Sequence, residues 1–274
     1  MSYDALLHKA IIASVLAGDE ILKVYDTNFS VELKSDHSPV TQADKQASDV
    51  IIAYLKKFNI PVLSEEDEHP SFDIRKHWDK LWVVDPLDGT KEFIKRNGEF
   101  TVNIALVENQ IPVIGVIYSP VFKDLYFANK ELGSFKIQQA DLLPLLKTIE
   151  KIELQQFIAL AKKLPTITNR TNHVVVASRS HLNTETYQYI ESLKLQHQTV
   201  DIINTGSSIK MCLIAEGVAD EYPRFGPTME WDTAAGNAIL LYADGCIIDD
   251  TTKQPMLYNK ESLFNNWFVA KRNF

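Results

Sequence analysis

The segment Asp85-Pro-Leu-Asp-Gly-Thr90 holds the residues of this sequence best suited to metal chemistry. It follows the apolar run Leu81–Val84, which reads as a buried strand, where a carboxylate is costly to bury unless a cation compensates its charge. Asp85 and Asp88 lie three residues apart around a proline, so both can face one side, with the Leu87 carbonyl between them as a further oxygen. Mg²⁺ takes such oxygen ligands together with water and substrate phosphate. The competing interpretation is an ordinary turn, because Pro, Asp and Gly are turn residues.

A second acidic cluster, residues 65–68, follows another short apolar stretch, residues 61–63. Sites in layered α/β proteins form at strand ends. We therefore expect Glu65 and Glu66 to face the same site as Asp85. The alternative interpretation is a solvated acidic loop.

Gly89 and Thr90 add features that suit a phosphate. Glycine lets the backbone approach an anion closely, and a helix that begins at Thr90 would direct N–H groups toward it. Phosphatases with an aspartyl nucleophile also carry an Asp-rich segment with Gly-Thr after a strand, but their two aspartates are spaced i, i+2. The i, i+3 spacing here changes which side chains share a face and argues against that class.

The elements that must position these residues alternate in type. The N-terminal segment, residues 6–22, has the 3.6-residue period of an amphipathic helix, and residues 41–58 read as a second helix that begins with a capping-box-like Thr41-x-x-Asp44. Strands are expected at 29–33, 61–63 and 81–84, and an antiparallel meander at 100–107, 112–118, 124–128 and 134–137. Further strands, expected at 174–177, 200–203, 219–222 and 246–248, alternate with helices near 185–193, 207–216 and 232–242.

This alternation predicts an α+β or α/β fold in which helices cover the sheets. Residues 138–172 differ from the rest, because their helix-like runs, 142–146 and 154–163, are broken by Pro144 and Pro165. We interpret them as a connection or an insertion between two halves of the chain.

Composition bounds the function classes. The 274-residue chain is 45% hydrophobic and 23% charged, which is ordinary globular composition and excludes disordered and fibrous classes. Its formal charge of −8 argues against nucleic-acid binding and is at odds with a phosphorylated substrate unless a cation mediates. No signal peptide or membrane-spanning stretch is recognised. We expect a cytoplasmic protein, and leave open peripheral attachment to the cytoplasmic face of the inner membrane.

Three motifs together resemble the inositol monophosphatase superfamily of metal-dependent, lithium-sensitive phosphatases. They are Leu63-Ser-Glu-Glu66, Asp85-Pro-Leu-Asp-Gly-Thr90 and Glu230-Trp-Asp-Thr-Ala-Ala-Gly236. Within that superfamily the chain most resembles the bacterial 3′(2′),5′-bisphosphate nucleotidases, on the supporting stretches Lys91–Asn103, Ser178–His181, Gly206–Lys210 and Tyr222–Gly226. The resemblance implies an αβαβα sandwich with metals between its two halves, and it is weakest over residues 138–172.

The resemblance also implies a role for each site residue. Two or three Mg²⁺ ions per site would be bound by Glu65, Asp85, Leu87 through its carbonyl, Asp88 and Asp232. Asp44 and Thr90 would form a hydrogen-bonded pair that activates a water, and Glu66 would help to position a water or a further metal. Without the resemblance, Asp44 and Asp232 could equally be ordinary helix caps. Six carboxylates would thus gather in one site and account for most of the net charge.

The implied substrate is adenosine 3′,5′-bisphosphate, which would be hydrolysed to AMP and phosphate as part of sulfur metabolism. A second implied substrate is the related 3′-phosphoadenosine 5′-phosphosulfate, which would give adenosine 5′-phosphosulfate. The second phosphate needs its own cationic or donor groups, and the resemblance assigns His181, Ser207, Lys210 and Arg224, with Gly89 and Thr90 at the scissile phosphate. An inositol or fructose phosphatase of the same superfamily remains an alternative, as does a non-catalytic nucleotide-binding regulator. We expect a monomer or homodimer with a small-molecule substrate.

We divide the chain accordingly into two halves that form one catalytic unit. Residues 1–165 would be an α+β half that carries most metal ligands. Residues 166–274 would be an α/β half that carries Asp232 and the nucleotide-binding residues.

Overall fold

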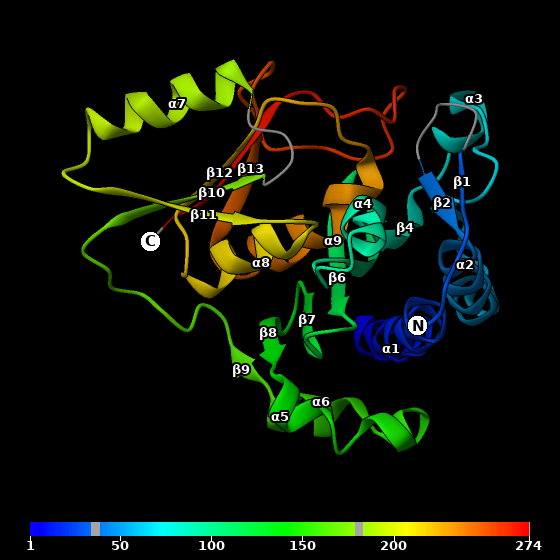
Figure 1. Ribbon diagram of the computed structural model, residues 1–274. Helices are drawn as coiled ribbons and strands as arrows, with labels where there is room; N and C mark the ends of the chain where they lie inside the picture. Colours follow the sequence, from blue (N-terminus) through cyan, green and yellow to red (C-terminus); the bar gives the residue numbers. More distant parts are fainter. Residues whose placement is uncertain (34–38, 179–182, 274) are drawn as a thin grey trace.

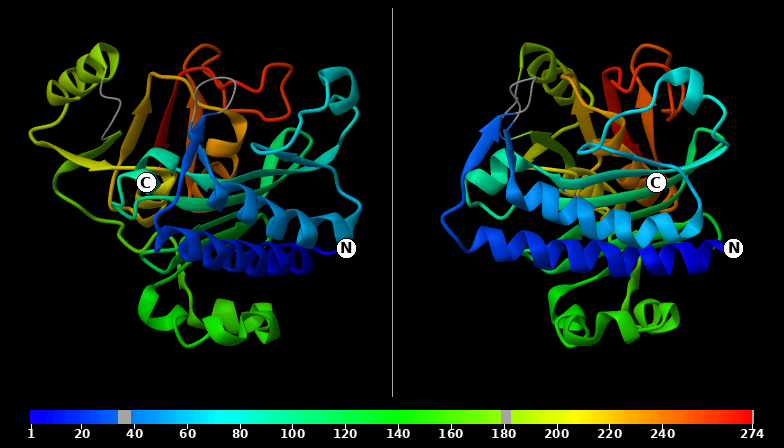
Figure 2. Two further views of the ribbon diagram at one scale, coloured as in Figure 1. Left: turned by 45° about the vertical axis from the view of Figure 1, so that its right-hand side comes forward. Right: turned by 90° about the vertical axis from the view of Figure 1, so that its right-hand side faces the viewer.

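The structure, a computed structural model, describes residues 1–33, 39–178 and 183–273. Within these residues, helices and sheets alternate in five layers (Figures 1 and 2). A helix pair covers one face of a seven-stranded sheet, two further helices lie between that sheet and a five-stranded sheet, and one helix lies on the outer face of the latter. This is the αβαβα sandwich that the sequence predicts.

The seven-stranded sheet carries most of the expected metal ligands. In spatial order its strands are β3 (Val62–Ser64), β4 (Lys80–Asp88), β5 (Thr101–Glu108), β6 (Ile111–Ser119), β7 (Asp124–Asn129), β8 (Gly133–Ile137) and β9 (Lys162–Lys163). β3 and β4 are parallel and the other neighbours are antiparallel, which confirms the predicted meander. Trp82 faces one core and Val83 the other, because side chains alternate along a strand and helices cover both faces.

The helix pair on the first face consists of α1 (Tyr3–Tyr25) and α2 (Gln42–Leu55), which lie side by side (Figure 2). A short antiparallel pair, β1 (Val31–Leu33) and β2 (Pro39–Thr41), precedes α2, and a 3₁₀ turn, η1 (Lys56–Phe58), follows it. The capping box between Thr41 and Asp44 is present as predicted. The capping box therefore holds Asp44, which is expected to help activate a water, in the first turn of α2.

The central helices are α8 (Ile209–Glu216) and α9 (Glu230–Leu241). α9 approaches β6 so closely that a Cβ atom built on Gly115 would lie 2.4 Å from the Ala235 carbonyl oxygen. Only glycine fits there, and the small residues of α9 allow the same close packing. The start of α9, with Asp232, is thereby held against the sheet that carries Asp85.

The five-stranded sheet has the order β11 (Val200–Thr205), β10 (His173–Ser178), β12 (Glu221–Arg224), β14 (Phe268–Arg272) and β13 (Gly245–Asp249). On its outer face lies α7 (Thr184–Lys194), whose Ile190 and Leu193 pack against Val175. Sequence reasoning misplaced β12, predicted at 219–222, and did not anticipate β14. β14 pairs with both β12 and β13, so its place depends on distant partners.

Residues 138–172 form α5 (Gln139–Leu142), a 3₁₀ segment η2 (Leu146–Lys151), α6 (Leu154–Leu160) and β9. The segment lies beside α1, at the bottom of Figure 1, and buries Leu142, Ile149 and Phe157 in the core that α1 shares. It connects the two sheets, as predicted. The predicted helix 154–163 is too long, because residues 162–163 pair with β8 instead.

Two short helices complete the inventory: α3 (Phe72–Arg75) and α4 (Thr90–Ile94). In the described ranges, no helix combines the length and the apolar character that crossing a bilayer requires.

Candidate metal and phosphate site

The Asp85–Asp88 segment is strand rather than the turn that sequence reasoning placed after residue 84. Asp85 pairs with Asn103, the register then shifts, and Asp88 pairs with Thr101. Pro86 and Leu87 form a bulge opposite the single residue Val102, which absorbs one extra residue of β4, as β-bulges next to sites do. Asp85 is buried, and its Oδ1 accepts a hydrogen bond from the Leu87 amide at 3.1 Å. Both aspartates are therefore held by the sheet itself.

Three carboxylates from three elements converge at this strand end. Glu65 follows β3, Asp85 lies on β4 and Asp232 lies in the first turn of α9, and one oxygen of each lies within 4.8 Å of the others. The Glu65 amide donates to the Val84 carbonyl at 3.1 Å, which ties the first loop to β4. The parallel pairing of β3 and β4 brings the two strand ends together, as expected from the sequence.

Electrostatics makes this cluster unfavourable without a cation. Burial, followed by the charges of Glu65, Asp88 and Asp232, raises the pKa of Asp85 well above its usual range. Burial, followed by the charges of Asp88 and Glu65, raises the pKa of Asp232 to about 8. Converging oxygens that resist ionisation are the donor set that a hard cation stabilises. The residues present therefore fit a divalent metal.

Asp44 and Thr90 meet beside this cluster. Asp44 Oδ2 accepts the Thr41 amide at 2.7 Å and the Thr41 hydroxyl at 2.8 Å, and its Oδ1 lies 3.4 Å from the Thr90 hydroxyl. Burial, the largest cause, and the nearby charges of Glu66 and Glu65 raise the pKa of Asp44 to about 6. Asp44 thus caps α2 and contacts Thr90 through different oxygens, so the two interpretations from sequence are compatible.

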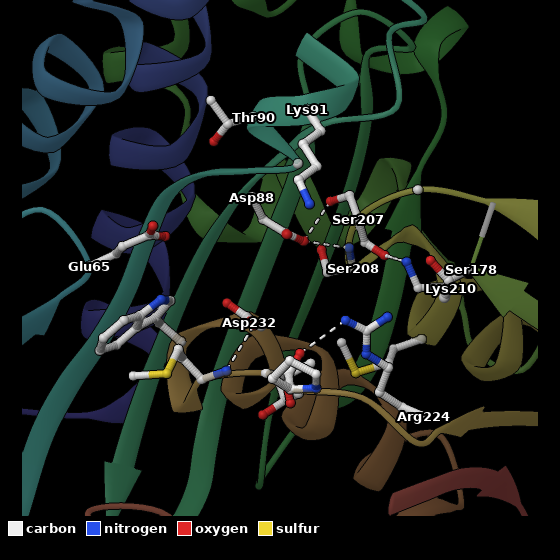
Figure 3. Close-up of a pocket in the computed structure, with 18 of the residues that line it drawn as sticks. Glu65, Asp88, Thr90, Lys91, Ser178, Ser207, Ser208, Lys210, Arg224 and Asp232 are labelled. Atoms are coloured by element: carbon white, nitrogen blue, oxygen red, sulfur yellow. Dashed lines mark hydrogen bonds between the residues drawn. The ribbon is translucent and has the colours of Figure 1, made fainter. Parts of the chain in front are cut away.

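Asp88 links the cluster to the C-terminal half of the chain. Its Oδ2 accepts hydrogen bonds from the Ser207 hydroxyl and the Ser208 amide, both at 2.6 Å (Figure 3). It also accepts one from the Asn103 side-chain amide at 3.5 Å. Ser207 has a left-handed backbone with φ = 56°. The segment before α8 is therefore shaped around this carboxylate.

Cationic side chains lie at the opposite side of the same cavity. Lys210 is buried, and its Nζ donates to the Ser207 carbonyl at 2.6 Å and lies 5.3 Å from the centre of the Tyr222 ring. Burial lowers the pKa of Lys210 to about 8. Arg224 Nη2 donates to the Pro227 carbonyl at 3.0 Å. The fourth residue expected here, His181, lies outside the described residues.

The cavity that joins these groups has a volume of about 630 Å³. Figure 3 shows Glu65, Asp88 and Asp232 on one side and Lys210 and Arg224 on the other. The lining includes the predicted residues Glu65, Asp88, Gly89, Thr90, Ser207, Lys210, Arg224 and Asp232. Sequence reasoning had no role for Lys91, His69, Trp231 and Phe264, which also line it. The first of these directly follows the Asp85–Thr90 segment, but no periodicity marked the other three.

Asp232 also caps α9, the alternative that sequence reasoning gave, but it does so from the third helical position, because the N-cap residue is Met229. Its Oδ2 accepts the Met229 amide at 2.9 Å. The other oxygen can point into the cavity, so the cap and the ligand role do not compete.

Comparison with known proteins gives concordant similarities. The model of the inositol monophosphatase family matches residues 4–273. The 3′(2′),5′-bisphosphate nucleotidase CysQ of Salmonella typhimurium is 46% identical over 256 residues, 92% of this chain and 94% of the relative. The CysQ of Escherichia coli K12 is 44% identical over 257 residues, with the same coverage.

Solved structures agree. The crystal structure of CysQ from Bacteroides thetaiotaomicron has a TM-score of 0.89 and 47% identity, and the match covers 99% of this chain and 98% of that one. An inositol monophosphatase from Thermotoga maritima, with a TM-score of 0.70 and 20% identity over 95% of this chain and 89% of that one, shows the same fold.

Proposed function

The chain belongs to the inositol monophosphatase family, and we propose that it is a metal-dependent 3′(2′),5′-bisphosphate nucleotidase. It hydrolyses the 3′-phosphate of adenosine 3′,5′-bisphosphate to give AMP and phosphate, and also acts on the corresponding phosphosulfate. One observation carries the proposal: a single cavity places a carboxylate cluster opposite two cationic side chains. A substrate with two separated phosphates matches that arrangement, and relatives that are 44–46% identical bear this activity in their names.

We propose Mg²⁺ as the cofactor, held by Glu65, Asp85, Asp88, Asp232 and the Leu87 carbonyl. When bound, two or three such ions would neutralise the scissile phosphate and lower the pKa of a water. The ligands come from β3, β4 and α9, so the site requires both halves of the chain, residues 1–165 and 166–274. This supports treating the halves as one catalytic unit.

In this proposal, Asp44 and Thr90 accept the proton of the attacking water. The Thr90 hydroxyl donates to Asp44 Oδ1 and can accept from a water on its other side. Asp44 is well suited to this because its second oxygen is already fixed by two hydrogen bonds from Thr41. Glu66 positions the water or a further ion from the adjoining loop. No covalent intermediate is needed.

The second phosphate is assigned to the cationic corner formed by Lys210, Arg224 and Ser207. The resemblance assigns His181 to the same phosphate, but this residue lies outside the described ranges. Lys210 is desolvated, which lowers its pKa, and an anion beside it would restore the charged form. Arg224 offers a planar donor group suited to phosphate. Gly89 and Thr90, at the start of α4, are assigned to the scissile phosphate. An inositol monophosphate would leave the cationic corner unused.

The proposed setting is the cytoplasm, in sulfur assimilation and nucleotide recycling, with lithium-sensitive activity and no macromolecular substrate. The decisive test compares turnover of adenosine 3′,5′-bisphosphate and inositol 1-phosphate by one preparation with Mg²⁺. We expect kcat/KM to favour the nucleotide. A preference for the inositol ester would assign the protein to the other branch of the family, and binding without turnover would make it a regulator.

A further inference from the structure

Three buried side-chain hydroxyls and one side-chain amide form a hydrogen-bonded cluster next to Asp88. Thr101 and Asn103 lie on β5, opposite Asp88 and Asp85 in the register, and both are at most 1% exposed. Ser207 and Ser208 reach them from the segment before α8 and are also buried. Thr101 Oγ1 lies 2.5 Å from Ser207 Oγ, 2.8 Å from Ser208 Oγ and 3.0 Å from Asn103 Oδ1.

The number of protons available fixes which group donates in the hydrogen bonds nearest Asp88. The Asp88 carboxylate only accepts, so the Ser207 hydroxyl, 2.6 Å away, donates its single proton to it. Ser207 must then accept across its 2.5 Å contact with Thr101, because two oxygens that close without a proton between them would repel. Thr101 is therefore the donor to Ser207, and its single proton is then not available to Asn103 Oδ1, which lies 3.0 Å from Thr101 Oγ1.

The Ser208 hydroxyl contributes the third proton of the cluster, and this proton can reach only one of two neighbouring oxygens. Ser208 Oγ lies 2.8 Å from both Thr101 Oγ1 and Asn103 Oδ1, so its proton has an acceptor on either side. The Asn103 side-chain amide points its nitrogen toward Asp88, at 3.5 Å, which turns its oxygen toward the hydroxyls. The result is a chain of donors from Thr101 through Ser207 that ends on one carboxylate oxygen of Asp88.

This chain fixes the orientation of Asp88. All the hydrogen bonds it receives from the described part of the molecule arrive at Oδ2, which leaves Oδ1 as the oxygen that can face a cation. The chain also holds Ser207 in its left-handed backbone conformation, which a serine rarely adopts unaided. Thr101 itself belongs neither to the cavity lining nor to the carboxylate cluster, so its effect on the metal site passes through Ser207.

We propose that Thr101 is a positioning residue for the metal site, which orients Asp88 through the Ser207 hydroxyl. The inference deepens the proposed function and depends on it, because it assumes that Asp88 is a metal ligand. Partners that hydrogen-bond metal ligands typically change metal affinity or activity by 10–100-fold when they are removed. Thr101→Val keeps the shape of the side chain and removes only the hydroxyl, with its donor and its acceptor, so we expect an effect near the lower end of that range.

The test measures Mg²⁺ affinity by calorimetry, without substrate, in the wild type and in Asp88→Asn, Thr101→Val and Thr101→Ser. We expect Thr101→Val to weaken Mg²⁺ binding about tenfold and Thr101→Ser, which keeps the hydroxyl, to bind within about threefold of the wild type. In the presence of substrate, Thr101→Val should raise the Mg²⁺ concentration for half-maximal activity, while kcat at saturating Mg²⁺ stays near the wild-type value.

The matched control is Thr186→Val, which removes another buried threonine hydroxyl, on α7, that hydrogen-bonds to Asn183 at 2.6 Å. Equal weakening of Mg²⁺ binding in both valine variants would show a general loss of stability and overturn the role of Thr101. The role of Thr101 would also be overturned if Thr101→Val bound Mg²⁺ within about twofold of the wild-type affinity while Asp88→Asn lost Mg²⁺ binding. If Asp88→Asn itself binds Mg²⁺ like the wild type, the metal site of the proposed function fails instead. Should Thr101→Val not fold, Ser207→Ala, which removes the next donor in the chain, takes its place with the same expected loss.

Discussion

Replacing Asp44 by Asn should stabilise the metal-free protein near neutral pH while removing most of its activity. Asp44 is 2% exposed and faces the charges of Glu65 and Glu66, so its ionised form is unfavourable when no cation is bound. Asn has nearly the same shape and carries no charge. It still offers one oxygen to the Thr41 donors that cap α2.

The magnitude follows from the pKa of Asp44, which rises from 3.8 to about 6 on folding. A rise of about 2 units corresponds to a cost of roughly 3 kcal/mol for the fully ionised side chain. The start of a helix favours a negative charge by about 0.3–1 kcal/mol, which opposes the gain. We therefore expect Asp44→Asn to raise the free energy of unfolding by about 2 kcal/mol, or Tm by roughly 4–8 °C.

The sign of the effect with pH is fixed by the same shift. Below about pH 4 the carboxyl is protonated in both the folded and the unfolded chain, so the wild type and Asp44→Asn should be equally stable in this respect. As the pH rises from about 4 to about 6, the unfolded wild-type chain ionises first, and the wild type loses stability relative to the variant. The full difference should be reached above about pH 7, where Asp44 is ionised in the folded chain as well.

Thermal unfolding in EDTA at about pH 4 and about pH 7.5 measures this difference, and turnover with Mg²⁺ measures the loss of activity, expected at about 10²–10⁴-fold. Asp49→Asn, on the exposed face of the same helix, is the control and should change stability by less than about 0.5 kcal/mol. A variant that is less stable than the wild type at the higher pH, or a gain that does not depend on pH, would refute the electrostatic reasoning.

Three further outcomes are expected. Asp85→Asn should lower turnover with Mg²⁺ to below about 1% and leave the circular dichroism spectrum unchanged, because it removes a ligand and the like-charge repulsion together. Arg224→Ala should raise KM for adenosine 3′,5′-bisphosphate about tenfold but leave KM for adenosine 3′-monophosphate unchanged. Only the bisphosphate has a second phosphate, which would lose its charged hydrogen bond to Arg224 in the variant. Glu230→Gln should cost about 3 kcal/mol in urea unfolding, because fully buried Glu230 accepts from the Asn259 and Lys260 amides and from Lys260 Nζ at 2.6–2.9 Å.

Sequence reasoning succeeded where the signal is local. The capping box at Asp44 depends on residues a few positions apart, and the structure shows it as expected. The pair Asp85 and Asp88 was also found from its local spacing, although the segment is a bulged strand and not a turn. The meander was readable from its runs of apolar residues. The helices of the second half were also placed to within a few residues.

The parts that escaped sequence reasoning depend on register and distant pairing. Thr101 and Asn103 look like polar residues in an apolar strand, and only the pairing of β5 with β4 places them behind the two aspartates. Glu230 stands beside a predicted ligand, but its partner, Lys260, lies in a loop far along the chain. The strand β4 was cut short because its bulge resembles a turn until its partner strand is known.

The net charge of −8 finds its explanation in how the folded chain separates its charges. Burial keeps Asp85 and Asp232 from ionising easily, and burial in the same cavity lowers the pKa of Lys210. A cation relieves the first cost and an anion the second, so the metal and a bisphosphate each offset a different part of the unfavourable electrostatics. Because the cation also attracts the phosphate, each should bind more tightly in the presence of the other. The acidity of the chain therefore does not oppose a doubly phosphorylated substrate, since it supplies the metal site on which that substrate depends.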